Sequence, residues 1–234
     1  MTDKPTLGIS ACLTGARVRY DAGHKLNRHL LRMLRPRAEL VPICPEAEAG
    51  FGVPREPVDL HGSPGRPRVV AKETGRELTQ ALRRWAMEAL EDPCEGLDGF
   101  IFRCKSPSCA VGSVPVYDED GGVVTSEGVG LFARMFAERY PFRRIVEGQE
   151  LATEEDVERF LGNVRLGREW RQLASEPGSV AEFHEKNCAL LAGVAPDEER
   201  AMGDVMANDG LEPEALHHRY GRLLASMLRH PALD

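Results

Sequence analysis

Short apolar runs of the β type alternate with helical segments along the first 150 residues of the chain. The runs TLGIS, ELVPIC, DGFIFR and RRIVE predict strands at 6–10, 39–44, 98–103 and 143–147. Helices are predicted over 27–35, 77–90 and 127–140. Strands that alternate with helices favour an α/β fold with a mainly parallel, Rossmann-like sheet flanked by helices.

Further features mark the other parts of the chain. The segments VDLHG and RVVAKETG predict a hairpin that leaves the main sheet. Thr153 opens a further helix, with Asp156 three residues on in a capping-box arrangement. The stretch EPGS at 176–179 is typical of a linker, and helices are predicted after it over 180–192, 197–208 and 213–229. We therefore expect an α/β domain over 1–150, a helix and linker over 151–178, and a small all-helical domain over 179–234.

Three cysteines follow three of the predicted strands. Cys12 lies just after the first strand, Cys44 closes the second, and Cys109 follows the third. In open parallel sheets the loops at the carboxyl ends of the strands converge, and ligands bind in the crevice between them. The three thiols are therefore expected to meet at one edge of the sheet.

Three convergent thiolates suit either zinc or an iron–sulfur cluster, because both favour soft ligands. Zinc ligands usually come in close pairs such as C-x-x-C, whereas the closest pair here is Cys104 and Cys109. A cubane cluster tolerates ligands on separate loops, and with three thiolates its fourth iron stays open as a Lewis acid. Clusters that serve electron transfer are more commonly ligated by four cysteines, so three ligands indicate chemistry at the metal. A zinc protein with the same three ligands remains an alternative.

Acidic and hydroxyl side chains lie close to these cysteines in the sequence. Glu46 stands two residues after Cys44 and is a candidate for proton transfer, although a carboxylate at the start of a helix needs no catalytic role. Ser106 and Ser108 precede Cys109 and could donate hydrogen bonds to cluster sulfur or to a substrate. The alternative for these two serines is simple turn chemistry.

Charge is unevenly distributed along the chain. The net charge is −7, and residues 151–234 carry 9 basic and 16 acidic side chains, so the whole excess lies there. The segment from Arg17 to Arg37 holds seven basic residues against one acid, namely Arg17, Arg19, Lys25, Arg28, Arg32, Arg35 and Arg37. Such a patch could attract phosphate or RNA, or it could be a solvated helix face. His24 and Lys25 are candidates for substrate contact, or simply part of a turn.

Composition also bears on location and on the remaining cysteines. No apolar run approaches the roughly 20 residues of a membrane span, and the N-terminus lacks the pattern of a signal peptide. A cytoplasmic protein that does not bind membranes is therefore expected, in which six cysteines do not form disulfides. Cys104 ends a strand that is predicted to be buried, Cys94 and Cys188 fit no constellation, and all three are interpreted as structural.

An ordered set of motifs over about residues 5–150 resembles the bacterial thiouracil desulfidase family. The motifs are ISACLTGARVRYDAGHK, VPICPE followed by GVPR, TGRELT, KSPSC and GLFAR. The later stretch AEFHEKNCALLAG is similar to the start of a helical domain fused to some members, which is implicated in tRNA recognition in relatives that desulfurate 4-thiouridine. Here that domain would be shortened.

This resemblance implies a [4Fe-4S] cluster with one open iron, held by Cys12, Cys44 and Cys109. Glu46 would be the proton-transferring carboxylate and Ser106 a hydroxyl in contact with substrate or sulfur. Ser108, Arg17, His24 and Lys25 are substrate-binding candidates. The implied reaction converts C=S to C=O in thiouracil, its nucleotide or 4-thiouridine in tRNA, with no net electron transfer and with release of sulfide. A tRNA-binding or structural metal protein without this activity is the alternative.

The sequence departs from the family pattern at two places near these residues. Ala110 follows Cys109 where the family usually has glycine, so the loop backbone could bend differently. Ala49 replaces the first of a usual glycine pair. The acidic C-terminal part also weakens the case for RNA, because contact with phosphates normally needs a basic surface.

Overall fold

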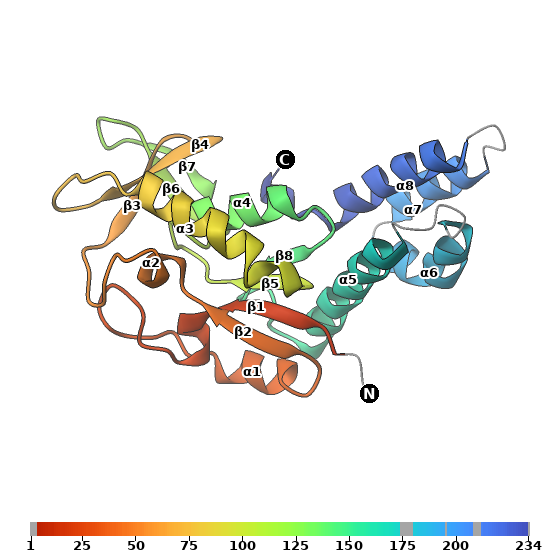
Figure 1. Cartoon of the computed structure of the whole chain (residues 1–234), viewed down its shortest axis with the longest axis horizontal. Coiled ribbons are helices and arrows are strands. Elements are labelled where there is room, and N and C mark those ends of the chain that lie inside the picture. The colour runs from red at the N-terminus through yellow and green to blue at the C-terminus, as the bar shows by residue number, and fades with distance from the viewer. Residues whose placement is uncertain (1–3, 174–179, 195, 208–211, 234) are drawn as a thin grey trace.

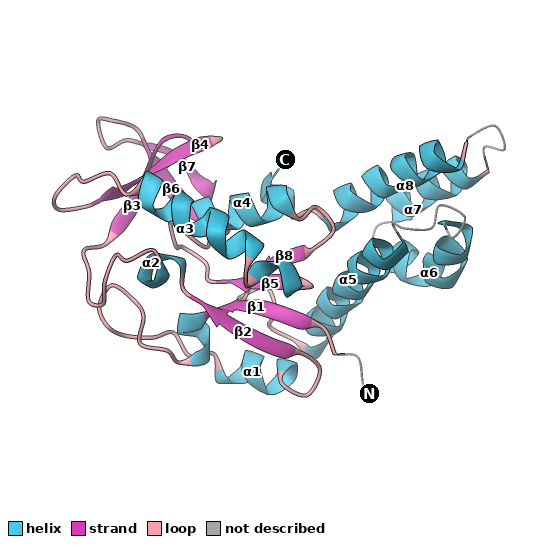
Figure 2. Ribbon diagram, viewed as in Figure 1, coloured by secondary structure: helices cyan, strands magenta, loops and turns pink. Residues whose placement is uncertain are grey.

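The structure is a computed structural model that describes residues 4–173, 180–194, 196–207 and 212–233. Its main sheet contains the four strands β1 (Thr6–Ser10), β2 (Glu39–Ile43), β5 (Gly99–Phe102) and β8 (Arg144–Glu147). The order is β2-β1-β5-β8, and every pairing is parallel (Figures 1 and 2). The predicted α/β fold with a mainly parallel sheet is therefore confirmed.

Helices cover both faces of this sheet. On one face α3 (Thr79–Glu91) and α4 (Leu131–Arg139) pack against Phe100 and Phe102. On the other face α1 (Arg28–Leu34) and the first half of α5 (Glu154–Leu173) pack against Leu7, Ile9 and Ile101. Side chains of β5 thus alternate between two cores, as the two-residue period of a strand requires.

Close packing requires a glycine in the middle of β1. A Cβ atom added to Gly8 would lie 2.3 Å from the ring of Phe100. Phe100 and Phe102 stack with centroids 4.0 Å apart on this face of the sheet. The Phe100 ring can therefore lie close against β1 only because Gly8 has no side chain.

A second sheet was not predicted. The expected hairpin is present as β3 (Val58–Ser63) and β4 (Arg66–Ala71), but β3 also pairs in parallel with β6 (Val111–Tyr117). β6 in turn pairs antiparallel with β7 (Val123–Val129), which gives the order β4-β3-β6-β7. The helix predicted over 127–140 was wrong at its start, because 127–129 belong to β7 and α4 begins at Leu131.

Gly130 explains where that helix begins. A Cβ atom at Gly130 would lie 2.5 Å from the carbonyl carbon of Ser108, so the chain passes very close to the loop before β6. The first amides of α4 donate to carbonyls of that same loop, Leu131 to Pro107 and Phe132 to Ser108, each at 3.0 Å. These bonds satisfy amide groups that have no partner within the helix.

The C-terminal part is helical, as predicted. The helices α6 (Val180–Val194), α7 (Pro196–Met206) and α8 (Pro213–Leu228) surround a core that contains Trp170 and Tyr220. At the start of α5 the predicted capping box is confirmed, since the Thr153 hydroxyl accepts from the Asp156 amide at 3.1 Å. The predicted linker at 176–179 lies outside the described residues.

α5 contributes to two cores. Its first half, through Val157, Phe160 and Val164, belongs to the core under the main sheet, while Leu166 and Trp170 belong to the helical core. Figure 1 shows α5 running from the sheet to the bundle of α6, α7 and α8. The division at residues 150 and 178 stays a prediction. No helix in the described parts of the chain is long and apolar enough to cross a membrane.

Candidate active site

The carboxyl edge of the main sheet carries a cavity of about 490 Å³. β2 lies on one side of β1 and β5 on the other, so the loops that follow these strands diverge and leave a crevice between them. Cys12 lies in the short 3-10 helix η1 (Ala11–Thr14), Cys44 precedes α2 (Pro45–Glu48), and Cys109 lies between β5 and β6. All three line this cavity.

The three thiols influence one another's ionisation. Burial, together with the neighbouring Cys44, raises the pKa of Cys12 to about 11. Burial also raises the pKa of Cys44, and it raises that of Cys109 further, with contributions from Cys44, Glu46 and Cys12. Arg103 and Arg19 act in the opposite direction on Cys12. In the absence of a metal the site therefore holds protonated thiols close to fixed positive charge.

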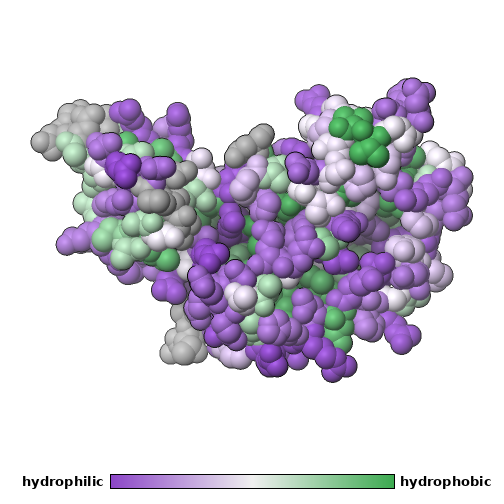
Figure 3. Space-filling model, turned by 180° about the vertical axis from the view of Figure 1, so that it is seen from behind, coloured by the Kyte–Doolittle hydropathy of each residue, from purple (hydrophilic) through white to green (hydrophobic). Residues whose placement is uncertain are grey.

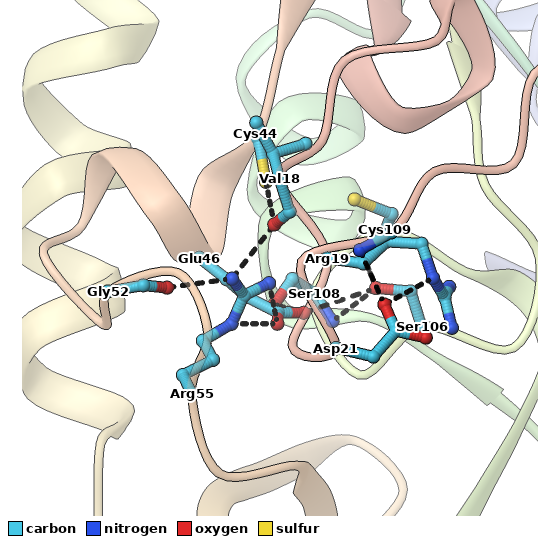
Figure 4. Close-up of polar contacts among 11 residues, drawn as sticks. Val18, Arg19, Asp21, Cys44, Glu46, Gly52, Arg55, Ser106, Ser108 and Cys109 are labelled. Atoms are coloured by element: carbon cyan, nitrogen blue, oxygen red, sulfur yellow. Dashed lines mark hydrogen bonds and ion pairs between the residues drawn. The ribbon is translucent and has the colours of Figure 1, made fainter.

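Glu46 lies in α2 and is surrounded by donors. Its Oε2 accepts from Nε and Nη2 of Arg55, at 3.0 and 2.7 Å. Its Oε1 accepts from the hydroxyls of Ser108 at 3.0 Å and Ser106 at 3.4 Å. Figure 4 shows the guanidinium on one side of the carboxylate and the serines on the other. The carboxylate is therefore held by a guanidinium at one oxygen and by hydroxyl donors at the other.

The loop from Arg103 to Cys109 is fixed by hydrogen bonds at both ends. The amide of Arg103 donates to the Ser10 hydroxyl, and that of Lys105, which has a positive φ of 55°, donates to Ser113, both at 2.9 Å. Ser106 Oγ accepts from the amide of Cys109 at 3.2 Å. The loop therefore presents hydroxyl and thiol from one rigid turn.

The two departures from the family pattern do not disturb the site. Ala110 is fully buried, and the positive φ angles of this region fall at Lys105 (55°) and Gly112 (87°). Ala49 has an ordinary φ of −72°, and the left-handed position is occupied by Gly50. Alanine is accommodated at both positions, because the backbone conformation that favours glycine lies elsewhere.

The candidate substrate-binding residues lie at different distances from the cavity. Lys25 lines it, and Ser108, which is buried, reaches it through Glu46. His24 is exposed and lines a neighbouring hollow of about 580 Å³ that shares Lys25 with the first. Arg17 is exposed and is not among the residues that line either cavity.

The other cysteines have separate surroundings. Cys94 is completely buried in the core beside α3, and Cys188 is exposed on α6. Cys104 is buried, lines both cavities, and lies 2.7 Å from Nη1 of Arg103. The structural interpretation of these three residues stays a prediction.

Several further side chains line the cavity although no sequence pattern singled them out. Arg55 and Arg103 come from the loops at the sheet edge. Asp59 in β3 and Lys72, which directly follows β4, form an ion pair of 2.9 Å. Arg55 stands in the motif GVPR, so the family resemblance was the one signal that could have found it. The residues that the second sheet contributes to the cavity could be found only from the tertiary fold.

The sequence profile of the 2-thiouracil desulfurase family matches residues 7–147, which include the whole of this site. The chain belongs to the 2-thiouracil desulfurase family. The part beyond residue 147, with α5 to α8, lies outside the matched region.

Two relatives of this desulfurase family member are informative. The uncharacterized protein YbbK of Bacillus subtilis (strain 168) is 28% identical over 127 residues, which are 52% of this chain and 83% of YbbK. Among solved structures, the [4Fe-4S]-dependent thiouracil desulfidase TudS matches with 27% identity and a TM-score of 0.52. That match covers 63% of this chain and 93% of TudS.

Proposed function

We propose that this member of the 2-thiouracil desulfurase family is an iron–sulfur-dependent desulfidase, of the hydrolase or lyase type, that acts on thiolated pyrimidines. One water replaces the sulfur, so that C=S and H₂O give C=O and H₂S without net electron transfer. The observation that carries the proposal is the convergence of three thiols, the Glu46 carboxylate and the Ser106 hydroxyl on one cavity. The structural likeness to TudS supports the same chemistry.

The residues of the site fit a cluster better than a single ion. Among the described residues, no three His, Cys, Asp or Glu side chains lie close enough together to hold one metal ion. A [4Fe-4S] cluster is bound through separate irons and needs thiolates that are spread more widely. Cys12, Cys44 and Cys109 meet this need, because they face one cavity from three loops and Arg103 and Arg19 offset their negative charge. We therefore propose these three cysteines as ligands, and a zinc site is less favoured.

When bound by the three cysteines, a [4Fe-4S] cluster would supply an open iron to act as a Lewis acid toward the thiocarbonyl sulfur. The chain supplies the proton chemistry. Glu46 accepts a proton from the attacking water at Oε1, the oxygen that faces the serines, and delivers it to the departing sulfur. The proton left on the new C–OH group follows by the same carboxylate, so that H₂S leaves and C=O remains. Ser106 and Ser108 hold this oxygen in place.

Recognition of the pyrimidine is assigned to the polar rim of the cavity. Lys25 lines the reaction cavity and Ser108 donates to Glu46, while His24 and Arg17 lie outside this cavity and would contact a larger substrate such as a nucleotide. The reaction needs no membrane, and we place it in the cytoplasm.

A surface feature favours tRNA as a second candidate substrate. A hollow of about 1030 Å³ lies between α4 and the helices α7 and α8. Among the described residues that line it, the charged and histidine side chains are Arg134, Arg143, Arg219, Arg222, Arg229, His230 and Glu138. Figure 3 shows the surface hollowed between the helical lobe and the α/β part. Although the C-terminal part is acidic overall, Arg219 and Arg222 of α8 line this hollow, where a phosphodiester chain could bind.

The first experiment is to measure iron and acid-labile sulfide in protein purified without oxygen, and then to add 4-thiouracil. About four iron and four sulfide per chain, with loss of the thiocarbonyl absorbance, is the expected result. Glu46→Gln should keep the cluster and lose turnover. Zinc in place of iron, or a loaded protein that leaves every thiolated pyrimidine intact, would overturn the proposal in favour of a structural metal protein.

The RNA variant of the proposal has its own test. Charge reversal of Arg219 and Arg222 in α8 should weaken binding of 4-thiouridine-containing tRNA and leave turnover of free 4-thiouracil unchanged. A matched control reverses Arg66 and Arg84, which are exposed elsewhere on the α/β part. If the Arg219/Arg222 variant bound tRNA as well as the Arg66/Arg84 control, the hollow would be excluded as an RNA site.

A further inference from the structure

Arg55 is buried beside Glu46, the proposed proton acceptor, and has no role in the reaction described above. Its side chain is 6% exposed, and that of Glu46 is 13% exposed. Two of its donors bind Glu46 Oε2, and its third donor group, Nη1, donates to the backbone carbonyls of Val18 at 2.8 Å and Gly52 at 2.9 Å. The guanidinium is thus engaged through all of its nitrogens.

These contacts make the two oxygens of Glu46 different. Oε2 is occupied by two charge-assisted hydrogen bonds, whereas Oε1 faces the hydroxyls of Ser106 and Ser108. The carboxylate cannot rotate without breaking both bonds to Arg55. A single oxygen is therefore directed at the part of the cavity lined by the serine loop.

The same guanidinium joins separate segments of the site. Val18 lies in the loop that follows η1, and its carbonyl also accepts a weak hydrogen bond from the Cys44 thiol, at 3.7 Å. Loss of that thiol proton, which binding of Cys44 to a metal requires, would leave the carbonyl held by Arg55. Arg55 therefore connects the loop after Cys12, the helix that carries Glu46, and its own loop.

We infer that Arg55 is a positioning residue of the proposed desulfidase, which fixes Glu46 so that Oε1 alone handles the proton. The inference rests on the proposed function. A lysine could not replace it fully, because an ammonium group is a point charge and cannot direct one nitrogen pair to the carboxylate while a third donor group holds two carbonyls.

The test compares Arg55→Lys and Arg55→Met with a matched control, Arg171→Gln. Arg171 forms a partly buried ion pair of 2.6 Å with Asp98, away from the site. Infrared carboxylate bands of Glu46, identified by their loss in Glu46→Gln, report its hydrogen bonding in cluster-free protein. We expect these bands to shift in both Arg55 variants and to stay unchanged in Arg171→Gln.

Kinetics of the cluster-loaded proteins complete the test. Arg55→Met should lower kcat by about 10²-fold with KM changed by less than about threefold, and Arg55→Lys should recover part of the loss. If Arg55→Met does not fold because it leaves a buried charge unpaired, Arg55→Lys gives the same two readouts. The inference about Arg55 would be overturned if the Glu46 bands did not shift in the Arg55 variants. It would also be overturned if Arg55→Met kept the wild-type kcat while Glu46→Gln was inactive, and neither result would affect the proposed function. An inactive wild type would overturn the proposed function, while the infrared bands would still decide the placement of Glu46.

Discussion

The backbone amide of Cys109 donates a 3.2 Å hydrogen bond to Oγ of Ser106, so a proposed ligand and a proposed catalytic hydroxyl share one turn. The same oxygen also accepts from the amide of Ser108 at 3.3 Å. With two amides directed at it, the hydroxyl has its own hydrogen available for Glu46. The geometry of the turn and the direction of the catalytic proton are therefore linked.

Ser106→Ala should lower turnover on the order of 10²-fold and leave iron content unchanged. The substitution removes one donor to Glu46 and the acceptor of two amides, but no proposed ligand. Turnover of 4-thiouracil and iron content are measured on the same sample. Ser126→Ala, at an exposed position of β7, is the control. Loss of iron in Ser106→Ala would show that the serine maintains the cluster site and is not specific to catalysis.

Cys12→Ser should lose the cluster, whereas Cys94→Ser should retain it. Both residues are buried, but Cys12 lines the cavity and Cys94 lies in the core. Iron and sulfide are assayed after anaerobic reconstitution. The proposed ligand set would be wrong if the two variants held equal amounts of iron.

The reactivity of the thiols should follow their burial. Burial raises the pKa of Cys94 to about 12, so about one molecule in 10⁴ carries this thiolate at pH 8. Cys188 is exposed and should be alkylated first. Because the folded-state pKa of Cys94 is raised, its contribution to stability is complete below about pH 9 and is lost as the pH rises toward about 12. Mass spectrometry of peptides after an alkylation pulse checks the order, and equal labelling of both cysteines in native protein would contradict it.

Two glycines in the helices should respond in opposite ways to alanine. A Cβ atom at Gly167 in α5 would lie 1.9 Å from the carbonyl oxygen of Phe142, whereas nothing lies within 4 Å of one at Gly193 in α6. Gly167→Ala should lower the free energy of unfolding by about 1–3 kcal/mol, and Gly193→Ala should raise it by about 0.5–1 kcal/mol. Urea unfolding measures both. A neutral Gly167→Ala would mean that α5 and the segment after α4 separate easily.

The main sheet could be predicted because its strands are short apolar runs buried on both faces. β1, β2, β5 and β8 all lie within one or two residues of their predicted positions. β6 and β7 were missed because their pairing shifts register and β7 exposes Val123 and Val124 at the edge of its sheet. Such strands lack the regular alternation that reveals a half-buried strand.

The candidate site was predictable in part, for a topological reason. Parallel strands bring their carboxyl ends together, so cysteines after three strands had to approach one another. The ion pair between Arg55 and Glu46 joins loops whose relative position depends on the whole fold, and no periodicity reports it. The wall formed by Asp59 and Lys72 belongs to the second sheet, which was itself missed.

The position of α5 limits how short a working version of this protein can be. The family match ends at residue 147, before α5 begins, yet Val157, Phe160 and Val164 complete the core beneath Leu7 and Ile9. A fragment cut at the family boundary would expose this apolar surface to water and would tend to aggregate. Extending the fragment through the whole helix would instead uncover Leu166 and Trp170, so that longer fragment would need polar residues at these two positions.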